Sequence, residues 1–380
     1  MSVFNVYPVF DITPVSAEDV FVYDEKNTKY LDLYGGHAVI SIGHSHPKYV
    51  EALTNQVQKI GFYSNSIENP LQKKLADTLT RMSNCKGYQL FMCNSGAEAN
   101  ENALKLASFH THKTDILAFK NAFHGRTSAA VAATDNAKIV APINAQQNVH
   151  FVDLGDLEAV ETVLKKNTTC AVIVECIQGV GGLDESTTAF YQGLDILCKK
   201  YNTILIADEV QAGFGRTGDF FSFQKHLITP DIISMAKGMG NGFPVGGILI
   251  HPKIKASYGL LGTTFGGNHL ACSASLAVLK VIEAQQLMQH VAIISEYFLA
   301  EAKKLPQLKK TKGRGLMLGL EFDFPIADLR KELIYKHHIF TGSAANPNVL
   351  RILPPLTITK KHIAQLFNAL HKVLEAKKFN

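Results

Sequence analysis

The stretch ISMAKGMGNGFPVGG, residues 233–247, places a single lysine between apolar residues and a run rich in glycine. Lysine is usually exposed because burying its charge is costly, so the position of Lys237 needs a chemical reason. Burial lowers the pKa of a lysine, and a neutral amine attacks carbonyl groups to form Schiff bases. The stretch therefore predicts a buried, reactive Lys237. The alternative is a lysine that reaches solvent from a glycine-rich loop.

Outward from Lys237, short apolar runs alternate with stretches of helical periodicity. The runs are rich in Ile, Val and Leu and lack a polar face, which is typical of strands covered by helices on both sides. They lie at residues 88–92, 115–119, 148–153, 170–175, 203–208, 232–236 and 245–250. The alternation predicts an α/β fold built on a largely parallel sheet.

The chain of 380 residues is long enough for two domains, and its pattern changes after a long helical stretch at 265–284. The elements expected beyond it are a strand at 313–322, a helix at 326–337, a strand at 349–353 and a final helix. We therefore expect three parts. These are an N-terminal segment (1–45) that packs with the small domain, a large cofactor-binding domain (46–280) and a small α+β C-terminal domain (281–380).

Charge and cysteine content argue against several kinds of partner. The net charge of +5 is small and spread out, apart from LKKTKGR at 308–314, which we expect to be a solvated loop. No nucleic acid partner is therefore expected. No apolar run reaches the ~18 residues of a membrane span, so no membrane partner is expected either. The six cysteines form no C-x-x-C pair, which predicts reduced thiols in a cytoplasmic protein.

Polar residues follow two of the expected strands. Ligands of open α/β sheets gather at the carboxyl ends of the strands, and Asp208 follows four apolar residues there. Ser95, Gly96 and Ala97 lie where a strand turns into a helix, whose first N–H groups and dipole favour an anion such as phosphate. Taken singly, the alternatives are an ion pair for Asp208 and an ordinary capped helix after Ser95.

Other kinds of site lack their signatures. The chain has no G-x-x-x-x-G-K-[ST], no H-E-x-x-H and no G-x-S-x-G, and the glycines after Lys237 do not form G-x-G-x-x-G. No metal is expected, because a turn before Pro47 explains the two histidines of GHSHP. What remains is an acid for a pyridine nitrogen, a phosphate cradle and a Schiff-base lysine. Together they form the protein's part of a pyridoxal 5'-phosphate site.

The order and spacing of these residues resemble the class III (ornithine-type) aminotransferases of fold type I, and among them the acetylornithine aminotransferases. The shared motifs run along almost the whole chain: GHSHP, NSGAEAN, FHGRT, DEVQAGFGRTG, AKGMGNGFPVG, TTFGGNHLAC, LMLGLEF and LRILPPLTI. The resemblance implies a large domain with a mostly parallel seven-stranded sheet flanked by helices, and a smaller α+β domain. It also implies a cytoplasmic homodimer with shared active sites.

The resemblance implies roles for the cofactor-binding residues. Lys237 carries the Schiff base and then moves the substrate proton, while Asp208 pairs with the pyridine nitrogen. Ser95, Gly96 and Ala97 hold the phosphate, and Thr264 reaches the same phosphate from the partner subunit. Phe123 stacks on the cofactor ring, Val210 packs behind the ring, and Gln211 lies near the 3-oxygen of the ring. Thr263 is adjacent to Thr264, so an offset of one residue stays open.

For the substrates, the resemblance implies that Arg126 binds the α-carboxylate of the donor. Arg351 binds the second carboxylate of glutamate or 2-oxoglutarate, because a guanidinium matches a carboxylate with two parallel hydrogen bonds. An internal ion pair is the alternative for each arginine. Glu175 and His37 are also expected at the substrate. His37 either bonds the acyl group or packs its own loop.

Val180 departs from the family pattern, in which a glutamate occupies this position of ECIQGVGG (175–182). Arg351 should then lack its acidic partner, and a buried arginine without an anion is costly. We therefore hypothesise that the donor itself brings an extra carboxylate. N-succinylornithine has such a group, and N-acetylornithine does not.

The reaction implied by the resemblance moves the δ-amino group of an N2-acylornithine, acetyl or succinyl, to 2-oxoglutarate in arginine biosynthesis. It follows a ping-pong route through the Lys237 Schiff base. Ornithine δ-aminotransferase and 4-aminobutyrate aminotransferase are the alternative activities. A scaffold that keeps the cofactor without turnover is a third alternative, and the intact Lys237, Asp208 and Arg126 argue against it.

Overall fold

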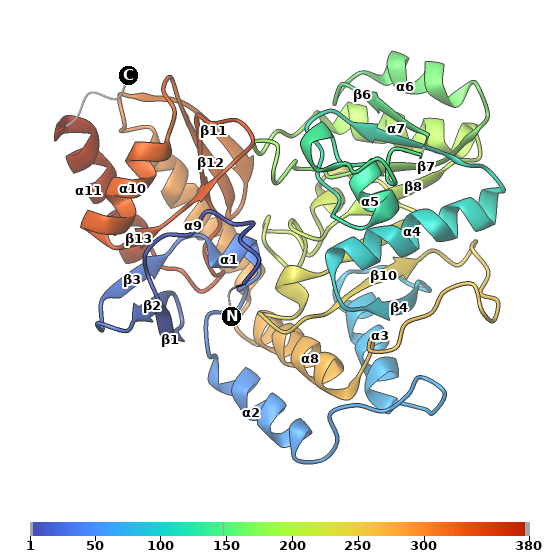
Figure 1. Cartoon of the computed structure of the whole chain (residues 1–380), viewed down its shortest axis with the longest axis horizontal. Helices are drawn as coiled ribbons and strands as arrows, with labels where there is room; N and C mark the ends of the chain where they lie inside the picture. The colour runs from blue at the N-terminus through green and yellow to red at the C-terminus, as the bar shows by residue number, and fades with distance from the viewer. Residues whose placement is uncertain (1–2, 147, 377–380) are drawn as a thin grey trace.

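A seven-stranded sheet forms the centre of the larger part of the computed structural model, which describes residues 3–146 and 148–376 (Figure 1). In spatial order the strands are β4 (Gln89–Cys93), β10 (Gly246–Ile250), β9 (Ile232–Met235), β8 (Ile204–Asp208), β7 (Thr169–Val174), β5 (Asp115–Phe119) and β6 (Val149–Val152). Strand β10 runs antiparallel to both neighbours, and the other pairs are parallel. The predicted mostly parallel seven-stranded sheet is confirmed.

Helices cover both faces of this sheet. Helices α4 (Gly96–Thr111) and α5 (Ser128–Ala132) lie on one face, and α6 (Leu157–Leu164) and α7 (Thr188–Lys200) lie on the other (Figure 1). Every residue of β5, β7 and β8 is buried, which is why these strands are apolar throughout. Because parallel strands end at the same edge, the residues that follow β7, β8 and β9 meet there.

Further helices surround the sheet and join the two parts of the molecule. They are α2 (Pro47–Val57), α3 (Pro70–Met82), α8 (His269–Ala284), and the 3-10 helices η1 (Ala137–Ile139), η2 (Ser222–His226) and η3 (Lys237–Met239). Within residues 3–146 and 148–376, no single helix is long and apolar enough to cross a bilayer. Helices α8 and α9 (Leu287–Ala302) reach that length only together, with a bend of 64° between them.

The smaller part contains an antiparallel sheet from the C-terminal third of the chain. Its strands are β11 (Leu308–Arg314), β12 (Met317–Phe322), β15 (Val349–Ile352) and β14 (Gly342–Ser343), in spatial order. Helices α9, α10 (Ala327–His337) and α11 (Lys360–Ala376) lie beside it (Figure 1). The sequence pattern predicted this mixture of helices and strands.

A third sheet brings the two ends of the chain together. It contains β1 (Pro14–Glu18), β2 (Phe21–Asp24), β3 (Lys29–Asp32) and β13 (Ile339–Phe340). Strand β13 lies parallel to β3, with Ile339 opposite Leu31. The N-terminal strands therefore share a sheet with the C-terminal part, while the domain boundaries at 45/46 and 280/281 stay predictions.

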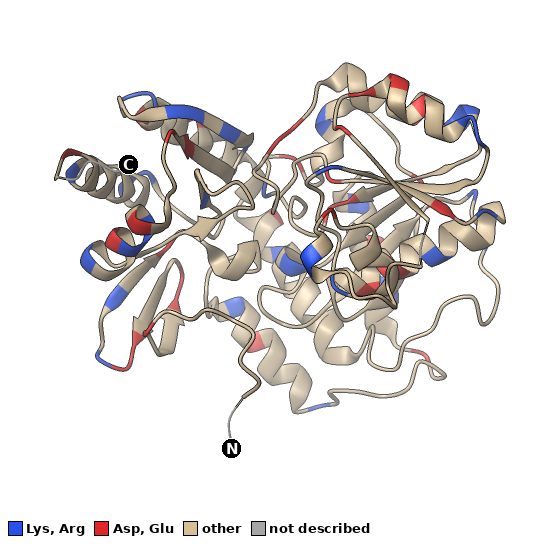
Figure 2. Cartoon of the chain, turned by 45° about the horizontal axis from the view of Figure 1, so that its top comes forward, with Lys and Arg blue, Asp and Glu red and all other residues tan. Residues whose placement is uncertain are grey.

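The basic stretch 308–314 was expected to be a loop, and this expectation is wrong. It forms β11, which pairs with β12 in a hairpin that turns at Gly315, so the single strand expected at 313–322 is also wrong. Strand β11 lies at the edge of its sheet, where lysines are common because they discourage pairing with other chains. Lysine and arginine mark this strand in Figure 2, while both signs of charge are interspersed elsewhere.

Element α1 (Gly35–Ala38) is a left-handed turn. Its two glycines have φ of 55°, and the next two residues, His37 and Ala38, have φ of 66° and 64°. An L-residue in this region costs roughly 1–2 kcal/mol because its Cβ crowds the following carbonyl. Such strain persists only where the surrounding structure enforces it, and it is frequent at functional sites.

Candidate active site

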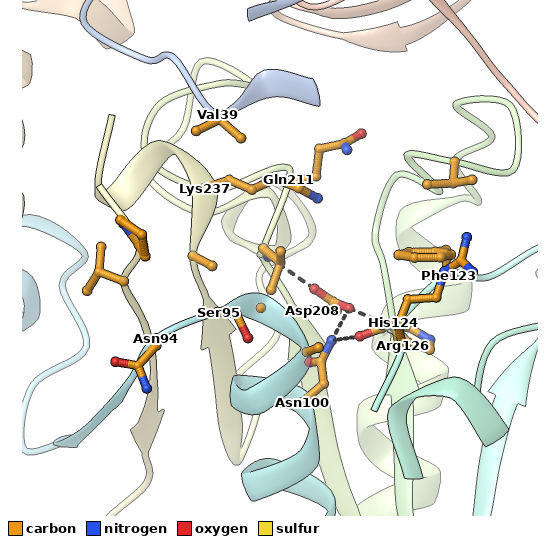
Figure 3. Close-up of a pocket in the computed structure, with 18 of the residues that line it drawn as sticks. Val39, Asn94, Ser95, Asn100, Phe123, His124, Arg126, Asp208, Gln211 and Lys237 are labelled. Atoms are coloured by element: carbon orange, nitrogen blue, oxygen red, sulfur yellow. Dashed lines mark hydrogen bonds and ion pairs between the residues drawn. The ribbon is translucent and has the colours of Figure 1, made fainter. Parts of the chain in front are cut away.

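A cavity of about 350 Å³ opens at the carboxyl edge of the large sheet, beside the start of α4 (Figure 3). Ten of the thirteen predicted site residues line it: Ser95, Gly96, Ala97, Phe123, Arg126, Glu175, Asp208, Val210, Gln211 and Lys237. Arg351, His37 and Thr264 lie outside the lining. The fold thus gathers residues that are up to 142 positions apart in the sequence into one cavity.

Asp208 is held in this cavity by three hydrogen bonds. Its Oδ2 atom accepts a hydrogen bond from Asn100 Nδ2 at 2.8 Å and lies 2.7 Å from His124 Nδ1. Its Oδ1 atom accepts from the Val210 N–H at 3.1 Å. Figure 3 shows these bonds converging on the carboxylate from below and from the side. Since a carboxylate accepts, His124 Nδ1 carries the proton, and the carboxylate direction is fixed before a ligand binds.

Asn100 and His124 are site residues that the sequence did not predict. Both are almost fully buried, and Asn100 Nδ2 also donates to the His124 carbonyl at 2.7 Å. Asparagine is unfavourable inside a helix unless its side chain has a partner. Asn100 lies one turn after Gly96 on α4, and His124 directly follows Phe123, so both signals were present in the sequence.

Lys237 follows β9 and adopts a left-handed backbone conformation with φ of 45°. Burial lowers the pKa of Lys237, while the nearby Asp208 and Glu175 oppose this shift. In the part of the chain that the structure describes, no hydrogen bond reaches its Nζ atom. A nucleophile or proton carrier needs an amine without a partner, and a strained backbone is frequent at functional sites.

The start of α4 has the features that the predicted phosphate site requires. Ser95 caps the helix, and its Oγ accepts from the Glu98 N–H at 3.2 Å. At Gly96 a Cβ atom would lie only 2.5 Å from Val210 Cγ1, so glycine allows the helix to begin directly against the loop after β8. The first N–H groups of a helix have no partner within it, and they point with the helix dipole towards the cavity.

Glu175 supports the cavity wall. Its Oε1 accepts from the Phe123 N–H at 3.0 Å, and its Oε2 accepts from the Gly179 N–H at 2.8 Å. Burial raises the pKa of Glu175 to about 6, with Asp208 adding to the rise and His124 opposing it. Both oxygens bond the backbone here, so a direct role at the substrate stays a prediction.

The cavity fits the pyridoxal phosphate that the sequence predicts. The helix start offers N–H groups for a phosphate, Asp208 offers a fixed carboxylate for a pyridine nitrogen, and Lys237 offers an amine. Gln211 adds a buried Oε1 atom that has no hydrogen-bond partner among the described residues. A buried polar atom without a partner is costly, so a ligand that bonds it is expected.

Arg126 lies at the rim of the cavity beside Phe123 (Figure 3). Its side chain is exposed, and no residue within 3–146 or 148–376 forms an ion pair or hydrogen bond with its guanidinium. A free guanidinium at a cavity rim suits the carboxylate of a ligand. The internal ion pair considered for this residue is not formed with any of the described residues.

Arg351 lies on β15 with 4% of its surface exposed. Its guanidinium donates to the carbonyls of Gly179 and Ser343 and to the Tyr34 hydroxyl. Among the described residues no aspartate or glutamate forms an ion pair with it, as Val180 led us to expect. Burial lowers the pKa of Arg351, and Tyr34 and Glu175 only partly oppose this.

His37 and Thr264 lie apart from the cavity lining. His37 Nδ1 is 2.5 Å from the Tyr34 hydroxyl, which places it next to Arg351. Thr264 is exposed in the loop before α8. A contact between Thr264 and a phosphate in the partner subunit stays a prediction.

Comparison with known proteins shows which protein family this chain resembles. The family described as Aminotransferase class-III matches residues 4–374. The acetylornithine aminotransferase of Bacillus subtilis is 38% identical over 380 residues, which cover 98% of this chain and 97% of that protein. The acetylornithine aminotransferase of Aquifex aeolicus is 38% identical over 97% of this chain and 99% of its own length.

Solved structures show the same fold. The ornithine aminotransferase of Toxoplasma gondii superposes with a TM-score of 0.91 at 26% identity, over 99% of this chain and 94% of that one. A second structure of that enzyme has pyridoxal phosphate at partial occupancy in its active site, with a TM-score of 0.91 at 25% identity, over 98% of this chain and 93% of that one. The expected fold type I is confirmed.

Proposed function

Because the chain belongs to the class-III aminotransferase family, whose members use pyridoxal 5'-phosphate, we propose that it transfers the δ-amino group of an N2-acylornithine to 2-oxoglutarate. The acyl group is acetyl or succinyl, and the reaction serves arginine biosynthesis. The observation that carries this proposal is the meeting of Lys237, Asp208 and the α4 start in one cavity of a chain that is 38% identical to acetylornithine aminotransferases.

The cofactor residues divide the work by position. When bound, pyridoxal phosphate draws electrons away from the substrate carbon that loses its proton. Asp208 holds a proton at the ring nitrogen, and the N–H groups of Gly96 and Ala97 hold the phosphate. Lys237 would move a proton from the donor carbon to the cofactor in the first half-reaction and from the cofactor to the acceptor carbon in the second, which its lowered pKa favours.

Two arginines orient the substrates. Arg126 binds the α-carboxylate of the donor at the cavity rim, and Arg351 binds the second carboxylate of 2-oxoglutarate. Donor and acceptor use the same cavity in turn, so the kinetics are ping-pong. Each carboxylate fixes the position of a reacting carbon relative to Lys237.

Free ornithine is the second candidate donor. The solved ornithine aminotransferase superposes closely on this chain, and this supports the alternative. Its identity of 26% is well below the 38% of the acetylornithine aminotransferases. The acylated donor is therefore preferred.

The experiment is a donor panel with the purified holoenzyme and 2-oxoglutarate. N-acetylornithine, N-succinylornithine, ornithine and 4-aminobutyrate are compared by kcat/KM. We expect at least one acylated donor to exceed both free amines by about 100-fold, because binding of the acyl group aligns the δ-carbon with Lys237. A higher kcat/KM for ornithine or 4-aminobutyrate would contradict the proposal.

The proposal includes a cytoplasmic homodimer in which each site uses a residue of the partner. Exposed apolar rings near Thr264 support it: Phe265 is 60% exposed and packs against Phe62, which is 43% exposed. Mixing inactive Lys237→Ala and Thr264→Lys chains should restore activity, because one site of the mixed dimer then carries neither substitution. A monomer in sedimentation, or no recovery on mixing, contradicts shared sites.

A further inference from the structure

A second guanidinium lies close to Arg351. Arg330, on α10, is half-buried, and its Cζ atom lies 5.9 Å from the centre of the Tyr34 ring and 5.0 Å from that of Phe10. The Arg351 Cζ atom lies 5.7 Å from the same Tyr34 ring. The Tyr34 ring therefore attracts two guanidinium groups, those of Arg330 and Arg351, by cation–π interactions.

The backbone of one extended segment holds both cations. Arg330 Nε donates to the Thr341 carbonyl at 2.8 Å, and Arg351 Nε donates to the Ser343 carbonyl. Carbonyls two residues apart in an extended chain point to the same side, about 6–7 Å from each other. Between them, a Cβ atom at Gly342 would lie 2.2 Å from Tyr34 Cε2, so this glycine makes room for the ring. We call Tyr34, Arg330 and Arg351 the arginine wall.

No acid of the described residues neutralises the arginine wall. Burial raises the pKa of Tyr34, so its phenol is uncharged at neutral pH. Burial and the nearby cations lower the pKa of His37, so it is uncharged as well. Glu175 is the acid that acts on Arg351, but both of its oxygens already bond backbone N–H groups. Two partly desolvated cations without a carboxylate favour a bound anion.

The proposed substrates do not need this many cations. 2-Oxoglutarate has two carboxylates, which Arg126 and Arg351 satisfy. An acetylated donor has one carboxylate, which Arg126 satisfies. Arg330 is left over in both half-reactions, although its charge is held at a fixed position.

We infer that Arg330 determines donor specificity: with Arg351 and Tyr34 it binds a carboxylate at the far end of the donor's acyl group. The preferred donor is then an ornithine acylated by a dicarboxylic acid, such as the succinyl derivative. Val39 and Val180 line the cavity and suit the methylene groups of such an acyl chain. This inference rests on the proposed function and narrows its substrate class.

Kinetics on the holoenzyme test the inference. We expect the wild type to have a kcat/KM for N-succinylornithine at least tenfold above that for N-acetylornithine. Arg330→Gln should lower this ratio at least tenfold, because it removes one charge-assisted hydrogen-bonded pair. Arg330→Lys should retain part of the preference. The control is Lys331→Gln, which removes an exposed neighbouring charge that pairs with Asp328 at 3.6 Å, and the ratio should not change.

A binding measurement on the wild type tests the inference without a substituted enzyme, so the result does not depend on whether a variant folds. N-succinylnorvaline and N-acetylnorvaline have the carbon chain of the donors but no δ-amine, so they bind without reacting. Calorimetry should give at least tenfold tighter binding of the succinyl compound. Equal binding of the two, or an unchanged kcat/KM ratio in Arg330→Gln, overturns the inference while acylornithine activity stands. If only ornithine or 4-aminobutyrate reacts, the proposed function and the inference both fail.

Discussion

The carboxyl edge of the large sheet and the arginine wall treat charge in opposite ways. At the sheet edge, Asp208 and Glu175 each accept at least two hydrogen bonds from the protein. At the wall, Arg330 and Arg351 are held by neutral carbonyls and an uncharged phenol.

The difference teaches which region is complete in the protein alone. The sheet edge is oriented in advance, so it can stabilise charge that develops during the reaction without reorganising. The arginine wall has positive charge that no acid of the described residues compensates. Its electrostatic attraction therefore stabilises the complex only when an anion binds. We therefore expect substitutions at the sheet edge to change kcat, and substitutions at the wall to change KM and specificity.

The largest effect is expected at Lys237. Lys237→Ala should lower kcat by more than about 10⁴-fold, because it removes both the nucleophilic amine and the proton carrier. Lys280→Ala, at an exposed position of α8, is the matched control and should retain wild-type kcat. Rates are measured with excess cofactor, so that weak binding does not mimic the loss. An active Lys237→Ala enzyme would overturn the assignment of the catalytic lysine.

Asp208→Asn tests the sheet edge itself. The amide keeps the size of the side chain but loses its charge, so we expect kcat to fall by about 10²–10⁴-fold while KM changes little. His124 and Asn100 then face an amide, and the melting temperature of the apoenzyme should fall. If Asp208→Asn changes KM and leaves kcat unchanged, the sheet edge does not differ from the arginine wall in the way we expect.

A buried acid next to Asp208 should make stability depend on pH. Glu209 accepts bonds from Ser222 and Phe223, yet burial raises its pKa to about 7. A raised pKa means that the folded state binds the proton more tightly than the unfolded state. The stabilising contribution is therefore complete below pH ~4.5 and is lost as the pH rises to about 7, a change of about 3 kcal/mol.

Urea unfolding between pH 4.5 and pH 8 checks this dependence in the apoenzyme. The free energy of unfolding of the wild type should fall relative to that of Glu209→Gln across this range, since glutamine does not titrate. If the two curves run parallel, Glu209 does not have a raised pKa in the folded protein.

The smallest effect is expected at the wall. Arg351→Gln should raise the KM for 2-oxoglutarate by about 10–100-fold, the loss of one charge-assisted pair, with kcat within about threefold of the wild type. Lys310→Gln, at an exposed position of the edge strand β11 of the same sheet, is the control. Equal falls in kcat and in kcat/KM, with KM unchanged, would place Arg351 with the sheet edge.

The large sheet was predictable because its signals are local. Strands β5, β7 and β8 are buried on both faces and so appear as apolar runs, and Asp208 and Lys237 follow such runs directly. Strand β11 was missed because its charged residues suggested a loop. It forms a strand by pairing with β12 in a hairpin, and the local sequence does not reveal this pairing.

The sequence predicted Arg351 as a site residue, but it did not predict that Tyr34, Arg330 and Arg351 form one cluster. Arg330 lies on an ordinary surface helix, and nothing near it in the sequence identifies a ligand. Its meaning depends on Tyr34, which comes from the N-terminal segment, and on the carbonyl of Thr341. Only the folded chain brings these three residues together. The roles of the thirteen predicted site residues stay predictions, although the fold gathers ten of them.

The pairing of β3 with β13 also sets an order of events on the ribosome. Leu31 must wait for Ile339, which is made about 300 residues later and, at about 5–20 residues per second, about 15–60 seconds later. Once residue 250 has been made, the larger part has all of its strands, whereas β1, β2 and β3 still form a short sheet with an open edge. A nascent chain that is stalled before β13 should therefore expose that edge to chaperones or to other copies of itself.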